Sequence, residues 1–171
     1  MSKVLISEKQ IKKALKKYGK ILTEEYKGKP LLLVSILSGA FVFMADLCRE
    51  IKLPVEISFM KVSSYFEGTV STGEVQINLD LNRDIKDYDV LIVEDIIDTG
   101  RTLYKIIDVL KQRGPKSIKV ITLLDKPERR LVDFKADYAL FTIPDKFIVG
   151  YGLDYAEKYR NLKNIEIVEN V

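Results

Sequence analysis

Hydrophobic and polar residues follow two different periods along this chain. Apolar positions recur at helical spacing over residues 11–26, 40–51 and 103–110, which predicts three helices with an apolar face. Continuous or alternating apolar runs stand between them, and they are typical of strands. The runs that we interpret as strands cover 31–37, 55–62, 74–81, 90–93, 118–124, 138–143 and 165–168. Strands that alternate with helices predict a doubly wound α/β fold, with a mostly parallel sheet and helices on both faces.

Local signals mark several element boundaries. Ser7 and Gln10 have the spacing of a capping box, which predicts the start of the first helix. Gly114 and Pro115 indicate the end of the third. Residues 63–73 are rich in glycine and hydroxyl side chains and show no period, so we expect a mobile loop or a long hairpin there. The chain contains no internal repeat or linker, and we treat residues 1–171 as one domain.

Composition narrows the class of protein. A hydrophobic content of 47% and a charged content of 31% exclude a disordered chain, and a net charge of +3 gives little support to nucleic-acid binding. The one cysteine, Cys48, lies in an apolar run and is expected to be a small core residue. The N-terminus lacks the apolar segment of a signal peptide, and the longest uncharged stretch, 31–45, is shorter than a membrane span. We therefore expect a cytoplasmic protein without membrane contact.

The chain contains no histidine. This excludes Ser-His-Asp and Cys-His catalysis and every histidine-ligated metal site. Acid–base chemistry must then use carboxylates, lysines or tyrosines. A metal held by oxygen ligands alone would most plausibly be Mg²⁺, shared with substrate phosphates.

One stretch, residues 90–102, combines several chemical features. The apolar run Val90–Val93 is followed by two carboxylates, Glu94 and Asp95, then by the turn Asp98–Thr102 and a helix. Ligands of open α/β sheets bind at the carboxyl ends of the strands. A turn that leads into a helix offers free N–H groups and a partial positive charge, which suit a phosphate. Taken alone, the acidic pair could equally be a solvated strand end.

Other strand ends should converge on the same sheet edge. Ser38 and Gly39 follow the strand at 31–37, and Lys126 follows the strand at 118–124. Carboxylates accept hydrogen bonds from hydroxyls, and a lysine donates them. The combination predicts a ligand with sugar hydroxyls and a phosphate. Aspartic proteases share the Asp-Thr-Gly sequence but have a duplicated β architecture, and the Walker phosphate-loop sequence is absent.

The whole of residues 90–102 resembles the phosphoribosyl-pyrophosphate (PRPP) motif of type I phosphoribosyltransferases. Three further segments resemble the hypoxanthine-guanine branch of that family: its pyrophosphate loop at 37–39, its catalytic loop at 64–73 and its purine-binding segment at 144–155. The resemblance implies the fold of that family, with a small hood built from the chain termini. It also implies Mg²⁺-dependent purine salvage, in which a 5-phosphoribosyl group passes from PRPP to N9 of hypoxanthine or guanine. Ser38 stands at a position where the pyrophosphate loop of that family commonly has a lysine. Arg101 likewise stands at a position where the PRPP motif often has a lysine.

The resemblance also implies roles for individual residues. Asp98 would be the general base, and Ser64 and Tyr65 the tip of the catalytic loop. The implied PRPP contacts are Glu94, Asp95, Ile97, Asp98, Thr99, Gly100, Arg101 and Thr102, with Ser38, Gly39 and Arg160 on the pyrophosphate. The implied purine contacts are Lys126, Phe147, Ile148 and Asp154, and the implied Mg²⁺ ligands are Glu94, Asp95 and Asp154.

Two alternatives remain open from the sequence. A nucleic-acid-binding regulator on the same fold would use the lysine-rich face of the first helix, although a solvated helix face explains those lysines more simply. A xanthine-preferring enzyme would share every motif, because Lys126 and Ile148 do not distinguish hypoxanthine, guanine and xanthine. The resemblance further suggests a homodimer or homotetramer that needs no nucleic-acid partner.

Overall fold

The computed structural model describes residues 2–67 and 70–169 and alternates strands with helices along most of its length. Its elements are β1 (Ser2–Ile6), α1 (Glu8–Glu25), β2 (Leu31–Leu37), α2 (Phe41–Glu50), β3 (Glu56–Glu67), β4 (Val70–Leu79), β5 (Asp89–Ile97), α3 (Arg101–Gln112), β6 (Ser117–Asp125), the 3₁₀ turn η1 (Pro127–Arg129), β7 (Tyr138–Thr142), β8 (Ile148–Val149) and β9 (Ile165–Val168).

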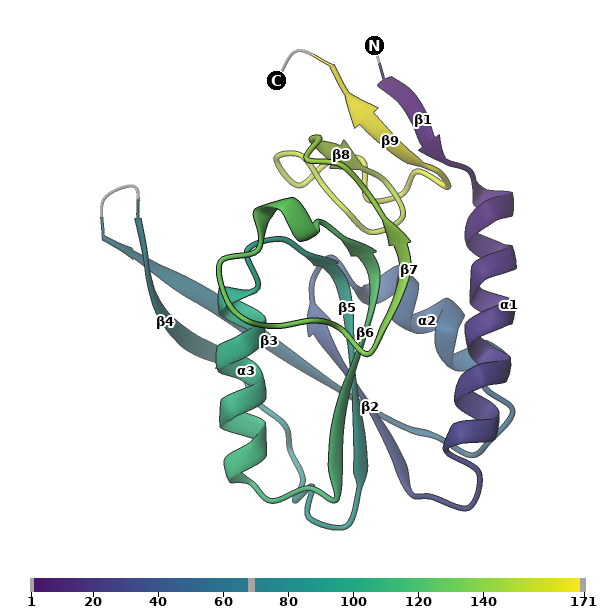
Figure 1. Ribbon diagram of the computed structural model, residues 1–171, viewed down its shortest axis with the longest axis vertical. Coiled ribbons are helices and arrows are strands. Elements are labelled where there is room, and N and C mark those ends of the chain that lie inside the picture. The colour runs from purple at the N-terminus through teal and green to yellow at the C-terminus, as the bar shows by residue number, and fades with distance from the viewer. Residues whose placement is uncertain (1, 68–69, 170–171) are drawn as a thin grey trace.

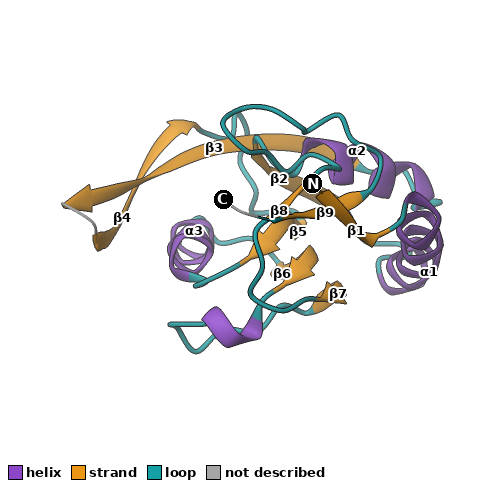
Figure 2. Ribbon diagram, turned by 90° about the horizontal axis from the view of Figure 1, so that it is seen from above, coloured by secondary structure: helices purple, strands orange, loops and turns teal. Residues whose placement is uncertain are grey.

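A six-stranded sheet in the order β4-β3-β2-β5-β6-β7 runs through the molecule. Neighbouring strands are parallel except for β3 and β4, which form an antiparallel hairpin at one edge. Helices α1 and α2 cover one face and α3 covers the other (Figures 1 and 2). The predicted doubly wound fold is therefore confirmed. Strands β2 and β5 lie at its centre, which explains why their sequences are continuous apolar runs rather than alternating ones.

The hood is a separate antiparallel sheet in the order β1-β9-β8, which brings the first and the last strand together above the main sheet (Figure 1). Ile6 and Ile165 are paired in it and buried. The side chain of Asn164 accepts a hydrogen bond from the backbone N–H of Glu8, at 2.9 Å, and so joins the hood to the start of α1. The hood therefore holds the segment before β9 close to the carboxyl ends of the central strands.

Several local expectations are confirmed. Ser7 and Gln10 form both hydrogen bonds of the capping box at the start of α1. Gly114 follows α3 with φ of +70° and donates its N–H to the carbonyl of Lys111 at 3.0 Å, as a C-terminal glycine does. Cys48 is partly buried against the core, and this burial raises the pKa of its thiol. No helix in the described ranges is long and apolar enough to cross a membrane.

Of the two alternatives for residues 63–73, the long hairpin is confirmed: the region belongs largely to the β3–β4 hairpin, with residues 68 and 69 outside the described part of the chain. Backbone pairing extends these strands beyond the apolar pattern. Two other expectations need correction. Strand β4 ends at Leu79, so Leu81 lies outside it. Ile21 was expected on the apolar face of α1 but is 38% exposed, because the buried face of this helix is narrower than the apolar pattern of its sequence.

Candidate active site

Two adjacent carboxylates lie near the end of the buried central strand β5. Glu94 accepts a hydrogen bond from the N–H of Asp95 at 3.0 Å, and Asp95 accepts one from the N–H of Ile96 at 2.6 Å. Burial raises the pKa of Glu94 well above its ordinary value, and the neighbouring charge of Asp95 adds to this; burial also raises the pKa of Asp95. A bound group that brings positive charge or hydroxyl donors would offset the cost of burying these two carboxylates.

Gly39 brings the end of β2 against this acidic pair. The Leu37–Ser38 peptide bond that precedes it is cis. A Cβ atom built on Gly39 would lie 1.7 Å from Oδ2 of Asp95, so no larger residue fits there without displacing that carboxyl. A Cβ atom on Gly152 would in turn lie 2.3 Å from the carbonyl oxygen of Gly39. The strand-end loop, the acidic pair and the segment before β9 are therefore in direct contact.

The turn between β5 and α3 encloses a cavity. Gly100 caps α3 with φ of +81°, a left-handed conformation that glycine adopts without strain, and the helix begins at the next residue. Because the first N–H groups of a helix have no partner within it, this turn presents donors and a partial positive charge to the cavity. The lining residues are Glu94, Ile96, Ile97, Asp98, Thr99, Gly100, Thr102 and Leu103.

The loop after β6 packs against that turn through backbone bonds. The N–H of Lys126 donates to the carbonyl of Ile97, and the N–H of Leu131 donates to that of Thr99, both at 3.0 Å. Arg130 donates from Nε to the carbonyl of Asp98 at 3.3 Å and forms an ion pair with Asp125. This loop therefore fixes one wall of the cavity.

Four charged side chains of alternating sign continue along this wall. Nε of Arg129 lies 2.6 Å from Oδ1 of Asp98, and its Nη1 lies 3.3 Å from Oδ2 of Asp145. Nζ of Lys126 lies 3.5 Å from Oδ1 of Asp145 and donates a hydrogen bond to the carbonyl of Lys146 at 2.8 Å. Asp98 first and Asp145 second raise the pKa of the Arg129 guanidinium.

The segment 144–155 places an aromatic ring beside these charges. Phe147 is 43% exposed, and its ring meets that of Tyr155 edge to face, with centroids 5.4 Å apart. Ile148 is buried in β8, so it offers its backbone rather than its side chain. An exposed ring next to a buried lysine and a carboxylate can bind a flat polar ring by stacking and edge hydrogen bonds.

Asp154 and Arg160 are paired with each other. Nη2 of Arg160 lies 3.1 Å from Oδ1 of Asp154, and Nη1 donates to the carbonyl of Gly152 at 2.8 Å. The charge of Arg160 also lowers the pKa of Asp95, which is a smaller effect than the burial that raises it. The two residues thus lie on the hood side of the acidic pair.

Among the described side chains, a hydroxyl contact joins the β3–β4 hairpin to the cavity. Oγ of Ser64 lies 2.9 Å from Oγ1 of Thr102, in the first turn of α3. This hydrogen bond links the hairpin to the cavity wall. Tyr65 belongs to the same strand, but its side chain lies outside the described part of the structure.

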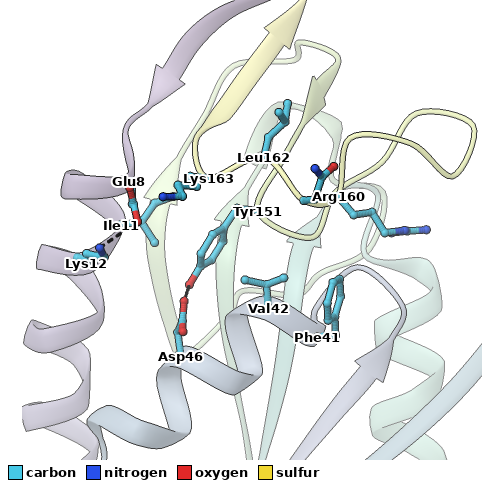
Figure 3. Close-up of a pocket in the computed structure, with 11 residues that line it drawn as sticks. Glu8, Ile11, Lys12, Phe41, Val42, Asp46, Tyr151, Arg160, Leu162 and Lys163 are labelled. Carbon is cyan, nitrogen blue, oxygen red and sulfur yellow. Dashed lines mark hydrogen bonds and ion pairs between the residues drawn. The ribbon is translucent and has the colours of Figure 1, made fainter.

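A second cavity lies between the start of α1, the start of α2 and the segment before β9 (Figure 3). The ring of Tyr151 points across it, and its hydroxyl donates to Oδ2 of Asp46 at 2.6 Å; burial and this bond raise the pKa of Tyr151. Glu8 and Lys12 form an ion pair at its rim. We assign the chemistry to the cavity at the β5–α3 turn, because helix N–H donors and the carboxylates of Glu94 and Asp98 occur there together.

The donor set at the acidic pair suits a magnesium ion. Glu94 and Asp95 offer carboxylate oxygens, which Mg²⁺ prefers, and their burial favours a nearby cation. Within residues 2–67 and 70–169, no cluster of three or more acidic or thiol side chains could enclose a metal by itself. An ion bound there would take its remaining ligands from water and substrate oxygens, as Mg²⁺ commonly does beside phosphates.

Comparison with known proteins agrees with this arrangement. The family model described as "Phosphoribosyl transferase domain" matches residues 4–156, and the chain therefore belongs to the phosphoribosyltransferase family. The hypoxanthine-guanine phosphoribosyltransferase of Streptococcus pneumoniae is 52% identical over 169 residues, which cover 99% of this chain and 94% of that protein. The crystal structure of a hypoxanthine phosphoribosyltransferase from Staphylococcus aureus superposes with a TM-score of 0.96 at 50% identity, covering 98% of this chain and 91% of that one.

A longer relative is also similar. The bifunctional protein TilS/HprT of Listeria monocytogenes serotype 4b is 51% identical over 169 residues, and this chain spans 26% of its length. The resemblance to hypoxanthine-guanine phosphoribosyltransferases expected from the sequence is thereby confirmed.

The fold brings the strand ends that carry Ser38, Glu94 and Lys126 to one edge of the sheet, as expected for parallel strands. The individual roles of the expected site residues stay predictions. Two charged residues beside the expected site, Arg129 and Asp145, were missed. Arg129 stands in a polar loop and Asp145 in an irregular segment, and neither has a spacing that signals a site. The signals that could have drawn attention to these charges are the position of Arg129 three residues after Lys126 and that of Asp145 inside the segment 144–155.

Proposed function

We propose that this protein transfers the 5-phosphoribosyl group of PRPP to N9 of hypoxanthine or guanine, with release of pyrophosphate. The observation that carries the proposal is the joining of two unlike half-sites on one sheet edge. The phosphate half comprises residues 38–39 and 94–102, apart from the side chain of Asp98. The base half comprises that side chain together with Lys126, Arg129, Asp145, Phe147 and Ile148. A sugar phosphate suits the first and a flat ring with a 6-oxo group suits the second.

In the phosphate half, the N–H groups of residues 97–102 would hold the 5′-phosphate, and Glu94 would face the ribose hydroxyls. Ser38, Gly39 and Arg160 would contact pyrophosphate. Mg²⁺ would be held by Glu94, Asp95 and Asp154 together with substrate oxygens. When bound, the ion would neutralise charge on the departing pyrophosphate.

In the base half, Asp98 would take the purine proton as the bond to the sugar forms. Its Oδ1 is buried and, among the described residues, has no donor aligned for a hydrogen bond. Lys126 would donate to the 6-oxo group and Phe147 would stack on the ring, with the backbone of Ile148 at the ring edge. A buried ammonium donor favours a 6-oxo group over the 6-amino group of adenine, because an amino group would leave it unpaired.

Closure of the β3–β4 hairpin would bring Ser64 and Tyr65 over the pyrophosphate and exclude water that would hydrolyse PRPP.

We also propose a homodimer or homotetramer. Phe41, Ile57 and Phe59 are large apolar side chains between 37% and 43% exposed, which is consistent with burial in a subunit contact. Sedimentation velocity would test this, and a monomer at micromolar concentration would contradict it.

The activity is tested with four bases. The protein is incubated with PRPP and Mg²⁺ and with adenine, hypoxanthine, guanine or xanthine, and nucleotide and pyrophosphate are measured. We expect equal amounts of nucleotide and pyrophosphate with hypoxanthine or guanine. Activity with xanthine alone would favour the xanthine-preferring alternative, and no product with any 6-oxopurine would overturn the proposal.

A further inference from the structure

Arg129 lies between the two polar side chains proposed to contact the base. It faces Asp98 on one side, with Nε 2.6 Å from Oδ1, and Asp145 on the other, with Nη1 3.3 Å from Oδ2. Asp145 in turn faces Lys126, whose Nζ lies 3.5 Å away. The proposed base and the proposed 6-oxo donor are thus the ends of one chain of alternating charges.

The position of Lys126 depends on this chain. Its side chain is only 9% exposed, so its ammonium group relies on protein partners rather than on water. The described partners are the carbonyl of Lys146 at 2.8 Å and the carboxylate of Asp145. Arg129 shares that carboxylate, and so it limits how strongly Asp145 draws Lys126 away from a bound purine.

The contact with Asp98 is of a different kind. Nε of Arg129 is close to Oδ1, but the angle is not that of a hydrogen bond, and this oxygen has no other aligned donor in the described residues. The guanidinium therefore holds the carboxylate in place mainly through its charge. An ionised carboxylate has further lone pairs that can accept a purine N–H.

We infer that Arg129 is a positioning residue for the purine: it orients Asp98 directly and Lys126 through Asp145. The inference rests on the proposed function, since both partners act on the base there. It assigns no contact between Arg129 and PRPP. Without the guanidinium, Asp98 would lose its orienting charge and Lys126 would be drawn toward Asp145.

The test uses Arg129→Gln in the full-length protein. We expect the KM for hypoxanthine to rise about tenfold or more, while the Kd of PRPP, measured by calorimetry, stays within about twofold of wild type. Arg129→Lys keeps the charge without the planar fork and should recover part of the loss. The matched control is Glu128→Gln, on the same exposed turn, which should leave both constants unchanged.

A double-mutant cycle with Asp145→Asn tests the route to Lys126. If Arg129 acts through Asp145, the effect of Arg129→Gln on KM should be smaller in the Asp145→Asn background than in wild type. Additive effects would overturn this route. Thermal unfolding midpoints of all variants should stay close to wild type, because Arg129 and Asp145 are both substantially exposed.

The outcomes separate this inference from the function on which it rests. An active wild type with an unchanged KM in Arg129→Gln would overturn the inference alone. So would an equal weakening of hypoxanthine and PRPP binding, because that indicates a disturbed loop. A wild type that makes no nucleotide would overturn the proposed function and the inference together.

Discussion

The phosphate half and the base half of the site are held in place by different forces. The phosphate half stands on β5, where residues 90–93 are 0% exposed, and its donors are backbone N–H groups of a turn and a helix start. The base half relies on charged side chains, among which Arg129 and Asp145 remain 44% and 47% exposed. A side-chain change can therefore alter the base half more easily than the phosphate half.

This difference has a physical reason. Backbone donors fixed by a buried strand cannot reorient without disturbing the core, so phosphate binding should be insensitive to most nearby side-chain changes. Exposed ion pairs contribute little to stability, and substituting them shifts local geometry at a small cost in folding. We expect substitutions in the base half to change turnover and base selectivity while PRPP affinity remains.

The largest effect is expected for Asp98→Asn, which removes the proposed general base and keeps its shape. Loss of general-base catalysis should lower kcat by roughly 10²- to 10⁴-fold. PRPP affinity should be nearly unchanged, because the backbone of the turn is intact. Steady-state kinetics and calorimetry check the two quantities, and a collapse of PRPP affinity would mean that Asp98 is a ligand of the phosphate half.

Lys126→Met should have the next largest effect. The methionine side chain fills the buried space without the ammonium donor, so the 6-oxo group loses a charged hydrogen bond worth about 1.5–3 kcal/mol, or roughly 10- to 150-fold in kcat/KM for hypoxanthine. Rates with hypoxanthine and adenine measure the change. If hypoxanthine use persists at the wild-type rate, Lys126 does not recognise the base.

Ser64→Ala tests the link between the hairpin and the phosphate half. Loss of the Ser64–Thr102 hydrogen bond removes about 0.5–1.5 kcal/mol, which corresponds to at most roughly tenfold in kcat/KM for PRPP. The control is Ser63→Ala, whose side chain is exposed on the same strand. Equal kinetics for the two variants would show that this contact is not needed for catalysis.

The smallest effect concerns a pair remote from both halves. Hydrogen bonds from Arg113 lower the pKa of Asp80, with Nη2 of Arg113 2.7 Å from Oδ2 of Asp80. A carboxyl group whose pKa is lower in the folded than in the unfolded protein stabilises the fold at pH values above its unfolded-state pKa. This stabilisation is lost as the pH falls through its folded-state pKa. Arg113→Gln should cost about 0.2–1 kcal/mol of unfolding free energy at pH 7 and less at pH 2. Denaturant titrations at both pH values test this, and kcat should not change.

Local patterns explain what could be predicted from the sequence. The apolar run, acidic pair, turn and helix of residues 90–102 are contiguous, so their order alone places the phosphate half on the sheet edge. Strand β8 has two residues and shows no period, and β1 is too short to be distinguished from a helix lead-in. The contact of Arg129 with Asp98 joins loops 31 positions apart, and only tertiary packing creates it.

The most direct test of the account is a competition between two bases in one reaction. Hypoxanthine and adenine are supplied at equal concentration with Mg²⁺ and limiting PRPP, and the ratio of their nucleotides gives the ratio of kcat/KM. We expect an excess of the hypoxanthine product of at least about 10²-fold, because the 6-amino group of adenine cannot accept a hydrogen bond from Lys126. A ratio near one, or PRPP that stays unused, would contradict it.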